Sequence, residues 1–283
     1  MPSDSQILQR ELAEKLRLEA SLKPGIRRIF RRVLDEFKAS VARTGRPQPV
    51  ARYAVAFETL LEDHYRKVAK AFKGAVLAQN NASSYAELKQ VEEDSETEEL
   101  IAAILLLWAD EHAPIQAGII TRTTERDMQD AVTQARDALI LQGMPTDNRS
   151  VAATAGAILK RILNNRVDLI VVTETQASAE MAKQVEAYTA AGAAVPGVPV
   201  PPDVALRPRP LVQPKLKKSW LDLRDDRTRE THIIAGRRYQ ESPIPITDTF
   251  VVGGFRMMIP GDTSLGAPIR EIANCRCSAR YFL

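Results

Sequence analysis

Three residues near the C-terminal end, His232, Cys275 and Cys277, have side chains that could bind a metal ion. Zinc takes histidine nitrogen and cysteine sulfur, usually with four ligands and with cysteines about two to four residues apart. The Cys-x-Cys spacing is tighter, and an acid such as Asp225 or Asp262 would have to supply the fourth ligand. We therefore prefer an interpretation without a metal, in which both thiols are small buried groups of a terminal strand.

The same histidine could act as a general acid or base. Asp225 or Glu230 could pair with His232, and Glu230 would share its side if the stretch is a strand. An activated nucleophile would have to be a cysteine. The chain has no Walker A motif, no Gly-x-Gly-x-x-Gly after a strand and no Gly-x-Ser-x-Gly elbow. We therefore predict a structural histidine bonded to backbone, no cofactor and no enzymatic activity.

The amino-acid composition limits the possible fold classes and indicates the cellular compartment. Of the 283 residues, 45% are hydrophobic and only 5% aromatic, a balance that favours helix over a β-sandwich. The net charge of +3 is too small to indicate nucleic-acid binding by itself. Two cysteines one residue apart are poorly placed for a disulfide, so we expect reduced thiols and synthesis in the cytoplasm. The most apolar run, residues 100–109, is about half a bilayer span, which predicts no membrane association.

The elements that must position these residues are mostly helices. Apolar spacing of three and four predicts helices over 4–22, 26–41, 51–79, 99–113, 124–141, 150–164 and 166–190. Proline is expected to break the chain at Pro24 and Pro114. Thr123 or Thr124 is expected as a helix N-cap, Gly143 as the residue after a helix end, and Asp147 with residues 148–150 as the cap of the next helix.

Beyond residue 194 the composition changes. Residues 195–214 contain seven prolines and predict a linker or an extended arm. The following Gly-rich, β-branched stretch predicts short strands, with a hairpin over 249–252 and 256–259. The predicted class is therefore α+β: a predominantly helical N-terminal two thirds and a small mixed C-terminal domain with short antiparallel strands.

Four arginines, Arg27, Arg28, Arg31 and Arg32, lie on the polar side of the helix predicted over 26–41. One interpretation is a solvated helix face. The other is a contact with DNA phosphates or with an acidic protein partner, because clustered arginines release counterions when they neutralise phosphates. No aromatic residues interleave with them, so stacking on bases is not indicated.

A series of residues between 119 and 283 follows a recognisable order. In sequence these are Thr123, Thr124, Gly143, Arg166, Ile170, Thr173, Glu174, Trp220, Asp225, Arg227, Arg229, His232, Gly236, Phe250, Pro260, Gly261, Asp262, Asn274, Cys275, Arg276 and Cys277. In this order the chain resembles the phage Mu F-like (MuF) minor head, or head morphogenesis, proteins of tailed phages. Residues 195–214 are longer than the family's usual connection, residues 167–172 are more apolar, and residues 1–118 carry no family motif.

The resemblance implies a structural protein of the virion, located inside the head near the portal vertex. Its implied partners are the portal protein and other head proteins, with non-specific contact to packaged double-stranded DNA as a further expectation. The implied modules are an N-terminal helical region (1–118), a helical part (119–194), the proline-rich arm (195–214) and a C-terminal part with short strands (215–283). Two alternatives stay open: a macromolecule-modifying enzyme using Glu174 and His232, and a DNA-binding packaging or ejection factor.

Overall fold

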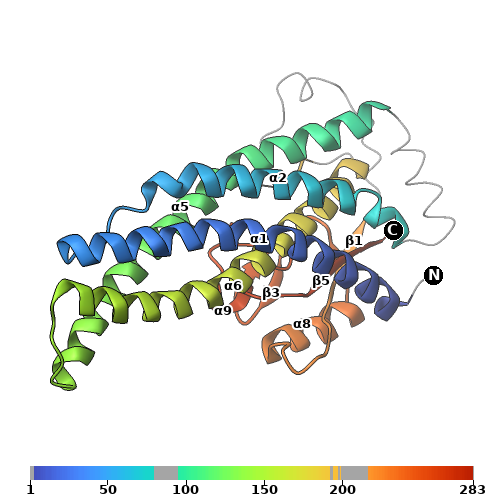
Figure 1. Cartoon of the computed structure of the whole chain (residues 1–283). Coiled ribbons are helices and arrows are strands. Elements are labelled where there is room, and N and C mark those ends of the chain that lie inside the picture. The colour runs from blue at the N-terminus through green and yellow to red at the C-terminus, as the bar shows by residue number, and fades with distance from the viewer. Residues whose placement is uncertain (1–2, 80–94, 192–193, 197, 199–215, 283) are drawn as a thin grey trace. The chain divides into compact units, whose positions relative to one another are not determined.

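The computed structural model describes residues 3–79, 95–191, 194–196, 198 and 216–282. It is α+β and mostly helical, with short antiparallel strands in the C-terminal region, as the sequence predicts (Figure 1). The helices are α1 (Asp4–Thr44), the 3-10 helix η1 (Ala51–Tyr53), α2 (Ala54–Phe72), α3 (Ala75–Ala78), α5 (Ser95–Leu141), α6 (Asn148–Ala190), α8 (Glu230–Glu241) and α9 (Ile269–Ile272). The strands are β1 (Lys217–Leu221), β2 (Ile244–Pro245), β3 (Phe250–Val252), β4 (Phe255–Met257) and β5 (Ser278–Phe282).

The chain forms two compact units, and each is built from segments that are distant in sequence. Unit 1 consists of Met1–Glu19, His64–Ala109 and Val172–Leu283, and unit 2 of Ala20–Asp63 and Asp110–Val171. These boundaries differ from the predicted sequence modules, which follow the order of motifs along the chain. Most of the predicted proline-rich arm lies outside the described residues. Among those described, no helix is long and apolar enough to span a bilayer.

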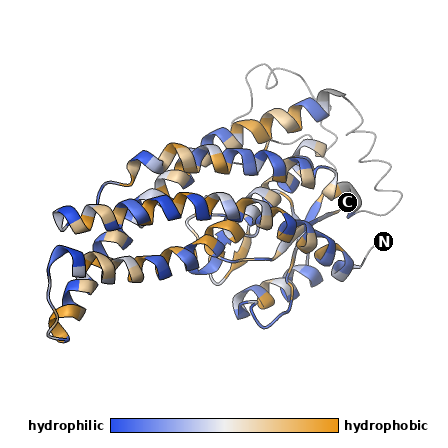
Figure 2. Ribbon diagram, viewed as in Figure 1, coloured by the Kyte–Doolittle hydropathy of each residue, from blue (hydrophilic) through white to orange (hydrophobic). Residues whose placement is uncertain are grey.

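Unit 2 consists of segments of α1, α2, α5 and α6. The ring of Phe30 on α1 packs edge-on against Phe57 on α2, with centroids 5.5 Å apart. Two glycines let helices approach closely. A Cβ on Gly25 would lie 2.7 Å from the Leu60 side chain, and one on Gly156 would lie 2.5 Å from Lys38. Amphipathic faces assemble this unit, as the mixed hydropathy along each helix in Figure 2 indicates.

The predicted breaks at Pro24 and Pro114 are wrong, because both prolines lie inside continuous helices. An interior proline costs a helix about 3 kcal/mol. The apolar stripe continues through each of them: Leu22 and Ile26 are buried around Pro24, as are neighbours of Pro114 such as Ala117. Burial on both sides of the proline therefore keeps each helix intact. The predicted break at residues 164–166 is also wrong, because the single helix α6 replaces the two helices predicted there.

Two predicted boundaries are confirmed. Gly143 has a φ of +63° just after the end of α5, which is the left-handed conformation typical of the residue that follows a helix. The Asp147 carboxylate accepts bonds from the backbone N–H groups of Arg149 and Ser150, at 2.9 and 3.1 Å, and caps α6. The predicted hairpin also forms, as β3 and β4 pair antiparallel with Val251 opposite Arg256.

In unit 1, the C-terminal half of α6 is buried almost all round. From Glu174 to Ala190, every residue except Ala177 and Met181 is buried. A three-stranded antiparallel sheet of order β2-β1-β5 belongs to the same unit, with Trp220 opposite Ala279. A helix with both apolar and polar residues buried needs an internal partner for each polar group. The buried polar side chains of α6 therefore bond to other groups of unit 1, as Glu174 does with Tyr65.

Candidate functional site

His232, Cys275 and Cys277, here called the His-Cys cluster, come together in unit 1. His232 lies in the first turn of α8, and the cysteines lie between α9 and β5. The imidazole Nδ1 is 3.4 Å from the Sγ of Cys277 and 3.6 Å from the Sγ of Cys275. The three side chains are buried, none more than 3% exposed. Residues more than 40 positions apart therefore form one contact group.

The elements that carry the cluster differ from those predicted. The cysteines are not in the terminal strand, because β5 begins at Ser278. Asn274, with a φ of +54°, turns the chain between α9 and Cys275, a conformation that asparagine tolerates. Glu230 and His232 lie on helix α8 rather than on a strand, and Glu230 is exposed whereas His232 is buried. A helix does not place residues two apart on the same face, so these two do not form the acid–base pair considered from the sequence.

Aromatic packing holds the imidazole of His232. The Trp220 ring, on β1, meets the His232 ring edge-on with centroids 5.4 Å apart, and meets the Phe250 ring at 5.3 Å. Trp220 and Phe250 are fully buried. Gly236, one turn further along α8, is required by sterics, since a Cβ there would lie 1.8 Å from a carboxylate oxygen of Asp222. The order of Trp, His, Gly and Phe in the sequence thus reflects one packed core.

A carboxylate that was not predicted from the sequence lies on the other side of the imidazole. The Nε2 of His232 is 3.5 Å from Oε2 of Glu271 on α9, and the Thr231 hydroxyl donates to the same oxygen at 2.9 Å. Asp222 is also buried, and its pKa is raised, chiefly by that burial. Glu271 lies only four residues before Cys275, so its proximity to the motif is the signal that could have identified it.

The two thiols influence each other's ionisation. The pKa of the Cys275 thiol lies well below its ordinary value, because a hydrogen bond with Cys277, and a further one with His232, stabilise its thiolate. The pKa of Cys277 is raised, because its hydrogen bond with Cys275 and its burial both oppose a second negative charge. The pair is therefore suited to carrying one negative charge in the absence of a cation.

Two acids of the C-terminal series, Asp225 and Asp262, accept hydrogen bonds within their own turns. The Asp225 carboxylate accepts from the Thr228 hydroxyl at 2.6 Å and from the backbone of Arg227 at 3.2 Å. Asp262, after Pro260 and Gly261, accepts from the backbone N–H groups of Met258 and Ser264, both at 2.7 Å. Gly261 has a φ of +87°. Asp225 and Asp262, the acids considered as a fourth zinc ligand, are thus engaged in their own turns.

Arg166 organises a second cluster of the series, within unit 2. Its guanidinium donates to the Thr124 hydroxyl at 2.8 Å and to the Asp127 carboxylate at 2.9 Å. The predicted N-cap role of Thr123 and Thr124 is wrong, because both lie within α5 and donate to the carbonyls one turn earlier. Burial lowers the pKa of Arg166, and Asp127 opposes that shift. This cluster ties α5 to α6.

Glu174 and Thr173, the Thr-Glu pair, lie on α6 at the start of its buried half. The Tyr65 hydroxyl donates to Glu174 at 2.5 Å, and burial together with Glu174 raises the pKa of that tyrosine well above its ordinary value. Two residues further, the Gln176 amide donates to the Cys277 carbonyl at 2.6 Å. Next along the chain from Cys275, Arg276 donates to the Glu19 carboxylate on α1 at 3.1 Å, and both side chains are mostly covered.

An ion network in unit 1 was not predicted. Lys183 lies 2.8 Å from Glu11 and 2.9 Å from Glu180, and Lys15 lies 3.0 Å from Glu180. Glu180 also accepts from the backbone N–H of Ala279 at 2.9 Å. The network therefore links α1, α6 and β5 through groups that are buried.

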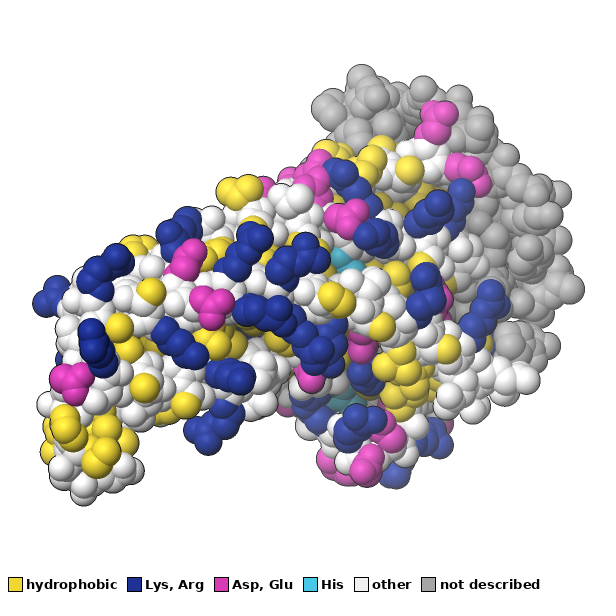
Figure 3. Space-filling view, viewed as in Figure 1, with side chains coloured by type: hydrophobic (Ala, Val, Ile, Leu, Met, Phe, Trp, Pro, Cys, Tyr) yellow, Lys and Arg dark blue, Asp and Glu magenta, His cyan; other side chains and the backbone are white. Residues whose placement is uncertain are grey.

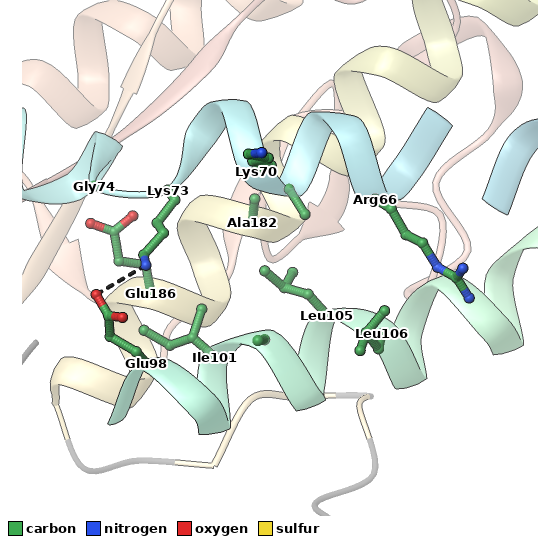
Figure 4. Close-up of a pocket in the computed structure, with 12 residues that line it drawn as sticks. Arg66, Lys70, Lys73, Gly74, Glu98, Ile101, Leu105, Leu106, Ala182 and Glu186 are labelled. Atoms are coloured by element: carbon green, nitrogen blue, oxygen red, sulfur yellow. Dashed lines mark ion pairs between the residues drawn. The ribbon is translucent and has the colours of Figure 1, made fainter. Parts of the chain in front are cut away.

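A cavity of about 320 Å³ lies between α2, α5 and α6 in unit 1 (Figure 4). Its walls are mainly apolar and include Ile101, Leu105 and Ala182, and an ion pair of 2.9 Å between Lys73 and Glu98 lies at its edge. The residues that line it do not belong to the series that carries the MuF resemblance. The sequence-selected residues and this cavity are thus separate features of the unit.

The four arginines of α1 are exposed in unit 2. Arg27, Arg28, Arg31 and Arg32 are more than about a third accessible to solvent, while their neighbours Ile29 and Phe30 are buried. Lys and Arg side chains gather over the helices in the face that Figure 3 shows. Within the described part of the chain, none of the ion pairs involves these four residues. Like charges four residues apart repel one another, so an anionic partner would relieve that repulsion.

Comparison with protein-family models, with curated proteins and with solved structures gave no match.

Proposed function

We propose that this chain is a non-enzymatic minor head protein of a tailed phage, which associates with the portal inside the head during assembly. The proposal rests on the order of the residues from Thr123 to Cys277 that resembles the MuF family. The observation that carries it is how the polar members of that series are used. They bond to the chain itself: Arg166 to Asp127, Glu174 to Tyr65, and Asp262 to its own turn.

Burial supports a structural role over a catalytic one. His232, Cys275 and Cys277 are at most 3% exposed, which closes them to a macromolecular substrate. Glu174, the acid of the enzymatic alternative, is 5% exposed and holds the Tyr65 hydroxyl. A packed module of this kind offers its outer surface to a partner and uses its motif residues for folding.

Crosslinking mass spectrometry of intact virions tests the proposal directly. We expect crosslinks between lysines of this chain and the portal protein, together with detection of the chain in purified heads. Matched particles from a phage that lacks the gene provide the control for background links. Absence of the chain from heads, or links only to tail or host proteins, would overturn the proposal.

Contact with packaged DNA is the second part of the proposal, and the exposed arginines of α1 favour it. From Ala20 to Thr44, α1 carries seven Lys or Arg residues against two acids. Each phosphate contact that forms adds to the salt dependence of binding, so the logarithm of the affinity should fall linearly with the logarithm of the salt concentration.

Two charge-reversal variants distinguish a DNA contact by the α1 arginines from a general effect of net charge. The first variant changes Arg27, Arg28, Arg31 and Arg32 to Glu. The control changes the four exposed basic residues Arg122, Arg149, Lys160 and Arg161 to Glu, for the same change in net charge. We expect non-specific duplex DNA to bind at least about 10-fold more weakly to the first variant than to the control, with a smaller salt slope. Equal losses in both variants would leave α1 without a special role in DNA contact.

A further inference from the structure

The geometry of the His-Cys cluster matches the ligand atoms of a small tetrahedral metal site. Its three candidate ligand atoms, Nδ1 of His232 and the two Sγ atoms, all lie within 4.8 Å of one another. With Zn–N and Zn–S bonds of about 2.0 and 2.3 Å, the edge of a tetrahedron between nitrogen and sulfur is about 3.5 Å. The two edges measured here are 3.4 and 3.6 Å. Both nitrogen–sulfur pairs are thus already at the spacing that a shared ion requires.

The far side of the imidazole has the arrangement expected behind a metal ligand. The Nε2 of His232 is buried, has no hydrogen-bond partner among the described residues, and faces Oε2 of Glu271 at 3.5 Å. Ligating histidines commonly donate their second N–H to a carboxylate, which fixes the tautomer and the ring orientation. With the proton on Nε2, Nδ1 presents its lone pair to the two thiols. Glu271 is itself held by the Thr231 hydroxyl.

Charge also favours a divalent cation at this place. Deprotonating both thiols in a site that is at most 3% exposed requires a compensating charge, since an unpaired buried charge costs several kcal/mol. One Zn²⁺ and two thiolates sum to zero. The tight Cys-x-Cys spacing, which argued against zinc at the level of sequence, is accommodated because Arg276 pairs with Glu19 on α1, while the thiols on either side of it both lie against His232.

We propose that His232, Cys275 and Cys277 bind one zinc ion through Nδ1 and the two Sγ atoms, with water in the fourth position. Both thiols bind as thiolates, so binding releases whatever thiol protons the pair still carries, and it involves no redox change. Glu271 acts as a positioning residue, because it holds the imidazole without touching the ion. The ion would join α8 to the segment before β5. This inference is independent of the proposed function in the phage head.

Cobalt substitution tests the ligand set on the full-length chain. Co²⁺ bound to thiolates gives a charge-transfer band in the near ultraviolet, and Cys275 and Cys277 are the chain's only cysteines, so such a band reports on them alone. After removal of metals with a chelator under reducing conditions, we expect one equivalent of Co²⁺ to produce the band and one equivalent of Zn²⁺ to abolish it. Elemental analysis of the protein refilled with Zn²⁺ should show one zinc per chain. A chain that gives neither the band nor stoichiometric zinc overturns the proposal, as does one that takes up Cu⁺ but not Zn²⁺.

Variants separate ligands from neighbours. Cys275→Ser and Cys277→Ser should each weaken zinc binding at least 10-fold, whereas His112→Gln, a histidine outside the cluster, should leave the affinity unchanged. Glu271→Gln should weaken it about 10- to 100-fold while the cobalt band persists, as expected for a residue that positions a ligand. If a cysteine variant fails to fold, the cobalt spectrum of the unmodified chain still decides the question. Unchanged affinity in both cysteine variants would contradict the assignment.

Discussion

Lys183 on α6 and Lys218 on β1 are both fully buried in unit 1, but their ammonium groups have opposite surroundings. Lys183 lies between the carboxylates of Glu11 and Glu180, at 2.8 and 2.9 Å. Lys218 donates to the Met258 carbonyl at 2.8 Å and lies over the Phe250 ring, 5.0 Å from its centroid. One lysine thus has full charges as partners, and the other has a dipole and a ring.

The two pKa values follow from this difference. Burial opposes the charge on Lys183, but Glu11 and then Glu180 outweigh it, so its pKa is raised. Burial also opposes the charge on Lys218, where Asp248 and Asp262 oppose the shift only in part, and its pKa falls to about 7. Desolvation therefore decides the charge of a buried lysine unless a carboxylate lies within hydrogen-bond distance. Lys183 therefore joins α6 to β5 in its charged form, whereas Lys218 can donate to the Met258 carbonyl without a charge.

The largest expected effect is from Lys183→Met. Removing this ammonium leaves Glu11 and Glu180 buried with only Lys15 to compensate them, so we expect a loss of about 3–5 kcal/mol in the free energy of unfolding. Urea denaturation followed by circular dichroism measures it. Lys23→Met is the matched control, because its ion pair with Asp168 is partly exposed and should contribute less than about 1 kcal/mol. Similar losses in both variants would remove the distinction between the buried network and a surface pair.

The second prediction concerns pH. Between pH about 7 and 10.5 the unfolded chain holds a proton on Lys218 that the folded chain does not. The free energy of unfolding should therefore rise with pH through this window, and the penalty of charging Lys218 is fully present below it. Lys218→Met lacks this contribution. The difference in stability between the variant and the unmodified chain should therefore favour the variant by about 3 kcal/mol more at pH 6 than at pH 9.

Denaturation curves at several pH values check this expectation. Lys217→Met is the matched control, because Lys217 is the exposed neighbour on the same strand. Its stability should run parallel to that of the unmodified chain at every pH. If the curve for Lys218→Met also runs parallel, the ammonium of Lys218 is not desolvated as described.

These buried groups show which parts of the molecule could be predicted from sequence. Apolar periodicity predicted the helices, and the Gly- and Asp-based signals at Gly143 and Asp147 placed two boundaries correctly. The helix breaks predicted at Pro24 and Pro114 are wrong, because burial of apolar residues on both sides outweighs the local cost of a proline. The buried ion network of Lys183 could not be predicted. Its local spacings, Glu11 with Lys15 and Glu180 with Lys183, are those of ordinary surface ion pairs on a helix.

The His-Cys cluster was partly predictable. Residue type alone singled out His232, Cys275 and Cys277, and their convergence follows from packing around Trp220. Their orientation could not be read from the sequence, because it depends on the left-handed turn at Asn274 and on the helix that carries His232. Only the assembled structure shows that Nδ1 faces both thiols while Nε2 faces Glu271.

The smallest expected effect tests how the neutral member of the Lys183 network contributes. The Ser278 hydroxyl accepts from Lys183 and lies within hydrogen-bond distance of the Glu11 carboxylate and, at 3.1 Å, of the Glu180 carboxylate, so it joins the charges without adding one. Ser278→Ala removes hydrogen bonds but leaves the ion pairs of Lys183 in place, and we expect a loss of about 1 kcal/mol. Ser264→Ala, at an exposed turn position, should change the stability by less than about 0.5 kcal/mol. A loss for Ser278→Ala as large as that for Lys183→Met would mean that hydrogen bonding, and not the balance of charge, holds this network together.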